Sequence, residues 1–206
     1  MRKFILIVCI LIVLAGCSAS PPEEAQPASL AAGTAFEHLV LPEGLPAINW
    51  MAIPLGAPEM DVLPGLGIAA GDIIDTVGGA NASYGFWSET DTTPDLWATL
   101  NVSLAGVPLD HANVVCQNGT IRYVGYEFHL DDFSDANAFW TAMQGLRQGL
   151  VSALDGKAVF LGERGEITTE GCGGIYRAYW SDGAVQLELE ILNDRICELR
   201  LTVPNN

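Results

Sequence analysis

The sequence predicts an α+β fold in which short helices and one longer helix pack on an antiparallel β-sheet. Three observations support this class. Apolar and polar residues alternate over 97–104, an Asn-Gly pair separates two apolar runs at 112–116 and 120–130, and residues 135–154 carry an apolar stripe at helical spacing. Three more strand-like runs follow the helix. The element order therefore suggests two similar αβββ halves, 50–130 and 134–204, although no residue-level repeat accompanies it.

The chain begins with a secretory signal. Arg2 and Lys3 precede the apolar run Phe4–Leu14, and small residues follow it. A helix of these eleven residues spans about 16 Å. That is too short for a hydrocarbon core of about 30 Å. Residues 1–16 are therefore predicted to be a signal peptide rather than a retained membrane helix.

The end of this signal, Leu14-Ala15-Gly16-Cys17, resembles the lipobox of bacterial lipoproteins. The resemblance implies a diacylglycerol, palmitate-type lipid on the Cys17 sulfur and cleavage between Gly16 and Cys17. Two acyl chains would hold the protein stably in the cell membrane or the outer membrane, facing outside the cytoplasm. The alternative is an ordinary secreted protein whose signal ends in cysteine.

The mature chain is acidic and divides into a tether and one domain. Residues 17–34 hold the lipidated cysteine and a Pro-, Ala-, Ser- and Glu-rich flexible tether, and residues 35–206 form an extracytoplasmic α+β domain. Without Arg2 and Lys3, 7 basic residues stand against 25 acidic ones, a net charge of −18. This balance excludes a nucleic-acid partner, which needs a basic footprint.

The first part of the domain is broken by prolines. Residues 36–41 suit a short strand, a helix is expected to begin at Pro58 and end before Pro64, and residues 72–77 suit a second helix capped by Asp72. Residues 82–94 are predicted to be a loop. The alternating run at 97–104 then predicts a half-buried strand.

The second part of the domain has stronger signals. Asn118-Gly119 predicts a type I′ hairpin, which needs two positive φ angles. Ser134 is expected to cap the helix 135–154, whose inward stripe is Phe139, Met143, Leu146, Leu150 and Leu154. Strands are expected at 175–180, 185–192 and 195–203.

The last two strands allow a prediction of register. Their apolar residues share one face only if the connecting loop holds an odd number of residues. A three-residue loop, Asn193 to Arg195, places Glu188 opposite Arg200 and Glu190 opposite Glu198.

The cysteines leave the redox state open. After lipidation of Cys17 and removal of Cys9, three cysteines remain: Cys116, Cys172 and Cys197. A disulfide between Cys172 and Cys197 is the best pairing, Cys116 could replace either partner, and three buried reduced thiols are an equal alternative.

No catalytic or metal-binding motif stands out, and no cofactor is expected. His38, His111 and His129 lie near no nucleophile motif and are read as surface or satisfied core histidines. The acidic residues before the long helix, Asp131, Asp132 and Asp135, suit capping better than calcium, because the calcium-loop spacing is missing.

Several segments resemble a known class of small bacterial lipoproteins. These segments are Ile53-Pro54-Leu55-Gly56-Ala57-Pro58-Glu59, Val102-Ser103-Leu104-Ala105-Gly106, Val115-Cys116-Gln117-Asn118-Gly119-Thr120-Ile121 and Tyr126-Glu127-Phe128. The domain is thereby similar to SmpA/OmlA-like and beta-lactamase-inhibitor-like folds, in which helices pack on a small antiparallel sheet. The resemblance implies an interaction module that binds another protein and carries no catalytic residues.

The sequence thus predicts a membrane-anchored, non-catalytic lipoprotein that binds a protein partner. The alternative is an envelope lipoprotein that binds a small ligand or a cation. A concave apolar pocket lined by a few convergent polar groups would favour this alternative, whereas a flat sheet with exposed aromatic residues would favour the first prediction.

Overall fold

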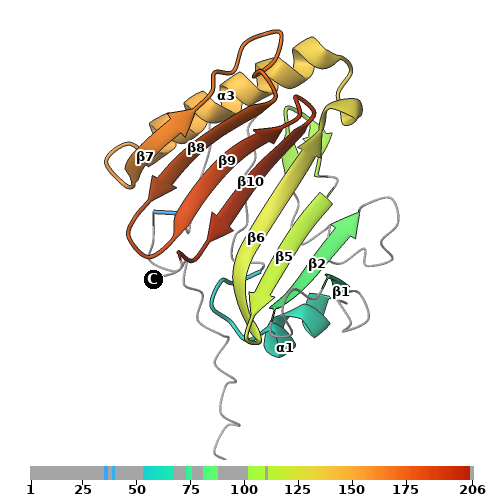
Figure 1. Cartoon of the computed structure of the whole chain (residues 1–206), viewed down its shortest axis with the longest axis vertical. Coiled ribbons are helices and arrows are strands. Elements are labelled where there is room, and N and C mark those ends of the chain that lie inside the picture. Colours follow the sequence, from blue (N-terminus) through green and yellow to red (C-terminus); the bar gives the residue numbers. More distant parts are fainter. Residues whose placement is uncertain are drawn as a thin grey trace, which may run out of the picture.

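An antiparallel sheet of eight strands carries the fold, with the order β1-β2-β5-β6-β10-β9-β8-β7 (Figure 1). The structure is a computed structural model and describes Ala35, Phe36, Leu39 and residues 53–66, 73–75, 81–87, 102–109 and 111–204, with only the backbone for 73–75 and 81–87. The predicted α+β class is confirmed.

The strands and helices have the following bounds. The large sheet contains β1 (Ile73–Asp75), β2 (Asn81–Trp87), β5 (His111–Gln117), β6 (Thr120–His129), β7 (Val159–Arg164), β8 (Ile175–Ser181), β9 (Gln186–Leu192) and β10 (Ile196–Thr202). A two-stranded sheet pairs β3 (Ser103–Leu104) with β4 (Val107–Pro108). The helices are α1 (Glu59–Val62), α3 (Ala136–Leu154) and the 3₁₀ turns η2 (Leu63–Leu66) and η4 (Leu130–Asp132).

The hairpins of the sheet form as their turn sequences predict. Asn118 and Gly119 both have positive φ, 52° and 72°, which confirms the type I′ turn between β5 and β6. The β9–β10 register is also confirmed. Leu192 pairs with Ile196 across a three-residue loop, and Glu188 lies opposite Arg200.

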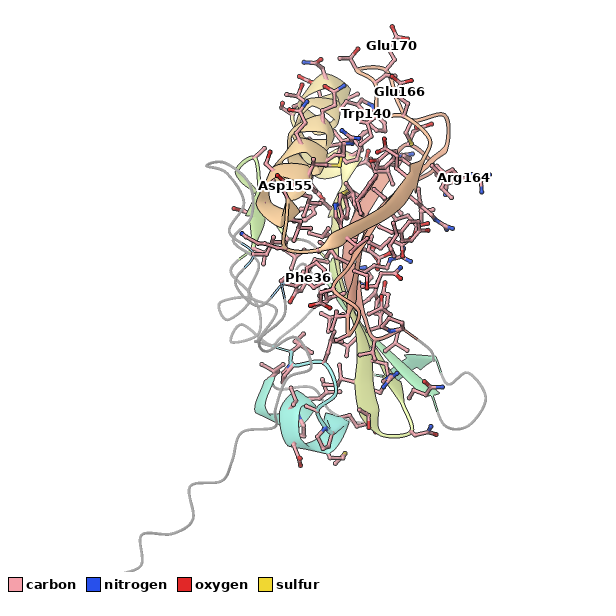
Figure 2. The ribbon with its side chains drawn as sticks, turned by 90° about the vertical axis from the view of Figure 1, so that its left-hand side faces the viewer. Phe36, Trp140, Asp155, Arg164, Glu166 and Glu170 are labelled. Carbon is pink, nitrogen blue, oxygen red and sulfur yellow. The ribbon has the colours of Figure 1, made fainter. Side chains whose placement is uncertain are left out.

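Helix α3 covers one face of the sheet (Figure 1, Figure 2). Its predicted stripe is buried in full: Phe139, Met143, Leu146, Leu150 and Leu154. The stripe packs in one core with the alternate residues of the strands, such as Tyr126, Leu189 and Leu199. Phe36 lies on the same side of the sheet and is fully buried.

The segment that contains α1 pairs with the beginning of β6 through backbone hydrogen bonds. Gly56 N–H donates to the Ile121 carbonyl at 2.8 Å, and Ile121 N–H donates to the Ala57 carbonyl at 2.9 Å. Pro58 forms a β-bridge to Thr120 at the hairpin turn. The proline-rich segment is therefore fixed by backbone hydrogen bonds to the hairpin, although it forms no long element itself.

Several predictions need correction. The helix predicted at 72–77 is wrong, since 73–75 form β1, and the loop predicted at 82–94 is wrong in its first part, since 81–87 form β2. Strand β7 was not predicted. The cap of α3 is Asp135, which accepts a hydrogen bond from Ala138 N–H at 2.8 Å, and not Ser134. Most of the predicted strands at 36–41 and 97–104 lie outside the described residues.

Candidate functional site

The sheet face opposite α3 carries a continuous group of polar side chains, called here the polar face. It comprises His111 and Asn113 of β5, Tyr123, Glu127 and His129 of β6, Glu198 and Arg200 of β10, Glu188 and Glu190 of β9, and Arg177 and Tyr179 of β8. Alternation along each strand sends these residues away from the helix. In Figure 2 the labelled Arg164 of β7, whose strand partner is Arg177, likewise points away from α3.

Three glutamates line up directly across neighbouring strands of this face. Glu190 of β9 lies opposite Glu198 of β10, and Glu198 lies opposite Glu127 of β6. Glu190 is only 1% exposed and Glu198 only 5%. Like charges directly opposite each other are unfavourable, and burial strengthens the repulsion. Cations must therefore hold this row together.

Arg200 is the main cation of the row. Its guanidinium lies 3.4 Å from Glu188 Oε2 and 2.6 Å from Glu198 Oε2, and it also contacts Glu190. Arg177 donates to Glu190 and lies 3.8 Å from Glu188. Two guanidiniums thus serve three buried carboxylates, which leaves an excess of negative charge.

Glu198 holds its proton more tightly than an ordinary glutamate because it is buried. Burial raises the pKa of Glu198 to about 7, against a smaller opposing effect of His111. Tyr123 Oη donates to Glu198 Oε1. Gly125 leaves the space for this bond, because a Cβ there would overlap Glu198 Oε1 and lie 2.8 Å from the Tyr123 hydroxyl.

Glu198→Gln is expected to remove a pH dependence of stability. The folded-state pKa of about 7 exceeds the usual glutamate value, so wild-type stability falls as pH rises from about 4.5 to 7. The glutamine does not titrate. The difference in unfolding free energy between variant and wild type should shift in favour of the variant by about 2–3 kcal/mol between pH 5 and 8.

Urea denaturation at the two pH values, with a chelator present, measures this shift. Glu170→Gln, at an exposed loop position, is the matched control and should show no comparable change. A difference between Glu198→Gln and wild type that stays constant with pH would contradict the assignment.

The far end of the polar face brings two histidines to one carboxylate. Glu127 Oε2 lies 2.8 Å from His111 Nδ1 and 3.4 Å from His129 Nε2. Asn113 Nδ2 donates to the other oxygen, Oε1. Burial works to raise the pKa of Glu127, but the hydrogen bonds from the two histidines outweigh it and lower that pKa.

The structure places the residues singled out in the sequence as follows. His111 and His129 come together, whereas Cys17 and His38 lie outside the described residues. Asp131 pairs with Arg195 at 2.8 Å, and Asp135 caps α3. Glu127, which joins the two histidines, was missed. The sequence did contain a sign of this contact. Glu127 and His129 are two residues apart in one strand, and residues i and i+2 of a strand share a face.

The three remaining cysteines, Cys116, Cys172 and Cys197, are buried free thiols, so the disulfide predicted between Cys172 and Cys197 is not formed in the structure. Burial raises the pKa of the Cys116 thiol to about 12, with a further contribution from Glu59. Burial also raises the pKa of Cys172 to about 12, and Asp194 adds to the effect. These thiols are held in the unreactive protonated form.

A second region lies between α3 and β7. Arg147 of α3 donates to Glu163 of β7 at 2.9 Å, and Tyr176 of β8 donates to the same carboxylate at 2.8 Å. They line a cavity of about 550 Å³ whose other walls are mainly polar. Ligand sites are usually lined by apolar groups, so this cavity does not favour the ligand-binding alternative.

Strand β7 itself exposes apolar side chains at the end of the sheet. Val159, Phe160 and Leu161 are 65%, 46% and 56% exposed. Leu161 is the extra residue of a bulge, since Phe160 pairs with Trp180 and Gly162 pairs with the adjacent Tyr179. In the described part of the chain, β7 has a strand neighbour on one side only.

Comparison of the chain with models of protein families, with curated proteins and with solved structures finds no match. Among the residues that the structure describes, no helix is both long enough and apolar enough to cross a membrane.

Proposed function

We propose that this protein is a membrane-anchored extracytoplasmic lipoprotein that acts as a non-catalytic protein-interaction module. The lipobox-like sequence ending at Cys17 supports the anchor, and residues 18–34 provide a tether. The observation that carries the interaction role is the exposed apolar edge formed by Val159, Phe160 and Leu161, called here the β7 edge.

The β7 edge has the features of a strand-addition site. An edge strand presents unpaired backbone N–H and C=O groups, and natural proteins usually protect such edges with charges, prolines or a covering element. β7 does contain a bulge at Leu161 and the charged residues Glu163 and Arg164, which are such protections, but three consecutive apolar side chains remain exposed. The ring of Phe160 is held against Trp180, with centroids 5.4 Å apart, so one anchor is already fixed in place.

The charge of the protein defines the partner. The whole chain carries 25 acidic against 9 basic residues, and Glu163 and Glu166 line the cavity beside β7. A partner segment that is extended, apolar on alternate positions and flanked by lysine or arginine would match both the backbone groups and the charge. We therefore commit to a basic, extended segment of another protein as the occupant.

The strand order supports the proposal of two similar halves. β1, β2, β5 and β6 follow α1, and β7 to β10 follow α3. The last strand of each group, β6 and β10, pair at the centre of the sheet. Each half would then contribute four strands to the large sheet, where the sequence pattern predicts three strands in each half, and the first half also contains the β3–β4 pair.

Leu161→Asp is expected to weaken partner binding by at least about tenfold, because it places a charge at the centre of the apolar contact. A photo-cross-linking residue at position 161 in living cells identifies the partner. Binding of the purified partner to wild-type and Leu161→Asp protein then measures the loss. Met60→Asp is the matched control, since Met60 is 71% exposed and lies on α1.

An exposed substitution of this kind should leave stability within about 0.5 kcal/mol of wild type. Unchanged affinity after Leu161→Asp would refute the β7 edge as the binding site. Cross-links from position 161 that join only two copies of this chain, or only its own tether, would likewise refute a separate partner.

The cation-binding alternative is favoured by one observation, the meeting of His111, Glu127 and His129. It concerns the β5–β6 end of the polar face and not the β7 edge.

A further inference from the structure

The fold brings three metal-ligating side chains to one point. One ligand atom each from His111, Glu127 and His129 can be chosen so that all three lie within 4.8 Å of one another. Glu127 Oε2 lies 2.8 Å from His111 Nδ1 and 3.4 Å from His129 Nε2. Bonds of about 2.0–2.1 Å from a tetrahedral zinc ion place ligand atoms roughly 3.3 Å apart. Small side-chain rotations would therefore suffice to bring the three atoms around one ion.

A bulge in β6 creates this arrangement. Gln117 pairs with Thr120 next to the turn, and with a regular ladder His111 would pair with Tyr126 of the core. Instead Val115 pairs with Tyr123 and Cys116 with Ile121, so Arg122 is the extra residue. The shift of one residue moves His111 to the same face as Glu127 and His129.

The carboxylate is oriented toward the histidines by a neighbour. Asn113 donates to Glu127 Oε1, which leaves Oε2 as the atom that faces both imidazoles. Hydrogen bonds of this kind, from a residue outside the ligand set, fix ligands in metal sites. The His129 side chain is 23% exposed, so an ion has access from solvent on that side.

The charges around His111, Glu127 and His129 also favour the binding of a cation. Arg177 and Arg200 are engaged by Glu188, Glu190 and Glu198. Among the described residues, no arginine or lysine lies within ion-pair distance of Glu127, whose oxygen Oε2 contacts the two histidines. A bound divalent ion would neutralise the excess negative charge of the buried row.

We propose that His111, Glu127 and His129 bind one divalent transition-metal ion of the zinc class, with water in the remaining position. Two imidazoles and one carboxylate suit zinc and its neighbours, whereas calcium and magnesium take all-oxygen sites. The sequence alone singles out no metal ligands, although cation binding is its alternative function. The proposed site is independent of the β7 edge, because β10, β9 and β8 separate β6 from β7.

The test uses the full chain purified without a histidine tag. Zinc titration by calorimetry should show one equivalent bound, and Co²⁺ substitution should give the strong visible absorption of a tetrahedral site. His129→Ala and Glu127→Gln should each weaken zinc binding by at least about 100-fold, and Asn113→Ala by about tenfold through loss of orientation. His38→Ala, which removes a histidine that is not one of the three proposed ligands, should leave affinity unchanged.

Zinc should also raise the melting temperature of the wild type and not that of His129→Ala. This comparison shows that the variant folds and has lost the site. Failure of stoichiometric zinc or cobalt binding would overturn the proposal. Equal binding by wild type, His129→Ala and Glu127→Gln, or a preference for Ca²⁺, would overturn it as well.

Discussion

Arg200→Met is expected to lower the free energy of unfolding by about 3–5 kcal/mol, the usual cost of removing one partner from a buried charge network. The guanidinium is shared by Glu188, Glu190 and Glu198, and its side chain is 18% exposed. Methionine retains much of the length and the apolar contacts of the stem. The loss of stability therefore measures the effect of removing the positive charge. In the variant, Arg177 is the remaining cation beside Glu190.

The matched control is Arg195→Met. Arg195 also forms an ion pair, with Asp131 at 2.8 Å, but the two side chains are 62% and 70% exposed. Such a surface pair contributes about 0–1 kcal/mol. Urea denaturation of both variants measures the difference. Comparable losses in the two variants would show that the polar face is hydrated far more than its burial indicates.

The loss of unfolding free energy in Arg200→Met should also depend on pH. Without the guanidinium, burial raises the pKa of the orphaned carboxylates in the folded state. A raised folded-state pKa makes stability fall as pH rises through it. The variant should therefore lose more stability at pH 8 than at pH 5. An equal loss of unfolding free energy at pH 5 and pH 8 would mean that lost packing, and not lost charge, destabilises the variant.

Local sequence signals predicted those parts of the fold in which turn chemistry and apolar spacing agree. Asn118-Gly119 set the β5–β6 turn, and the odd loop between β9 and β10 followed from the need to bury Leu189 and Leu199 together. The helix stripe was equally clear. In each case one short window contained both the pattern and its boundaries.

The missed strands β1 and β7 carry little pattern of their own, although each pairs with the next strand in the sequence. Ile73–Asp75 is too short for its periodicity to separate strand from helix, and its strand pairing is with β2. β7 has exposed side chains on both faces, so no alternation marked it. Sequence reasoning finds strands by their buried face, and an edge strand with little burial gives a weak pattern.

The metal-ligand cluster could not be predicted because it depends on the bulge. From the turn alone, His111 belongs opposite Tyr126, on the core side. The apolar residues that face the core in β6 recur at every second position from Val124 onward, but Ile121 and Val124 are three positions apart. This spacing was the one available sign that a residue is inserted between them. Register, more than residue type, decides which histidine meets Glu127.

Cys17→Ala is expected to abolish incorporation of labelled fatty acid and removal of the signal peptide. In the proposed anchor a thioether on Cys17 would carry the diacylglycerol, and alanine has no sulfur to accept it. Metabolic labelling with a palmitate analogue and the mass of the N-terminus measure both effects. Cys9→Ala is the matched control within the same segment and should be labelled and cleaved as the wild type is. Label retained by Cys17→Ala would refute the proposed anchor.

The same reasoning predicts that attachment depends on this single residue. A single acyl chain binds membranes only marginally, so stable anchoring takes a second acyl chain or a polybasic patch. Without the proposed signal peptide the chain would have 7 basic residues against 25 acidic ones, so an anionic surface would repel it. The lipid on Cys17 would therefore supply all of the attachment. A chain that starts at Ser18 behind a cleavable signal without cysteine should appear wholly in the soluble extracytoplasmic fraction, and its retention on membranes would show a second contact.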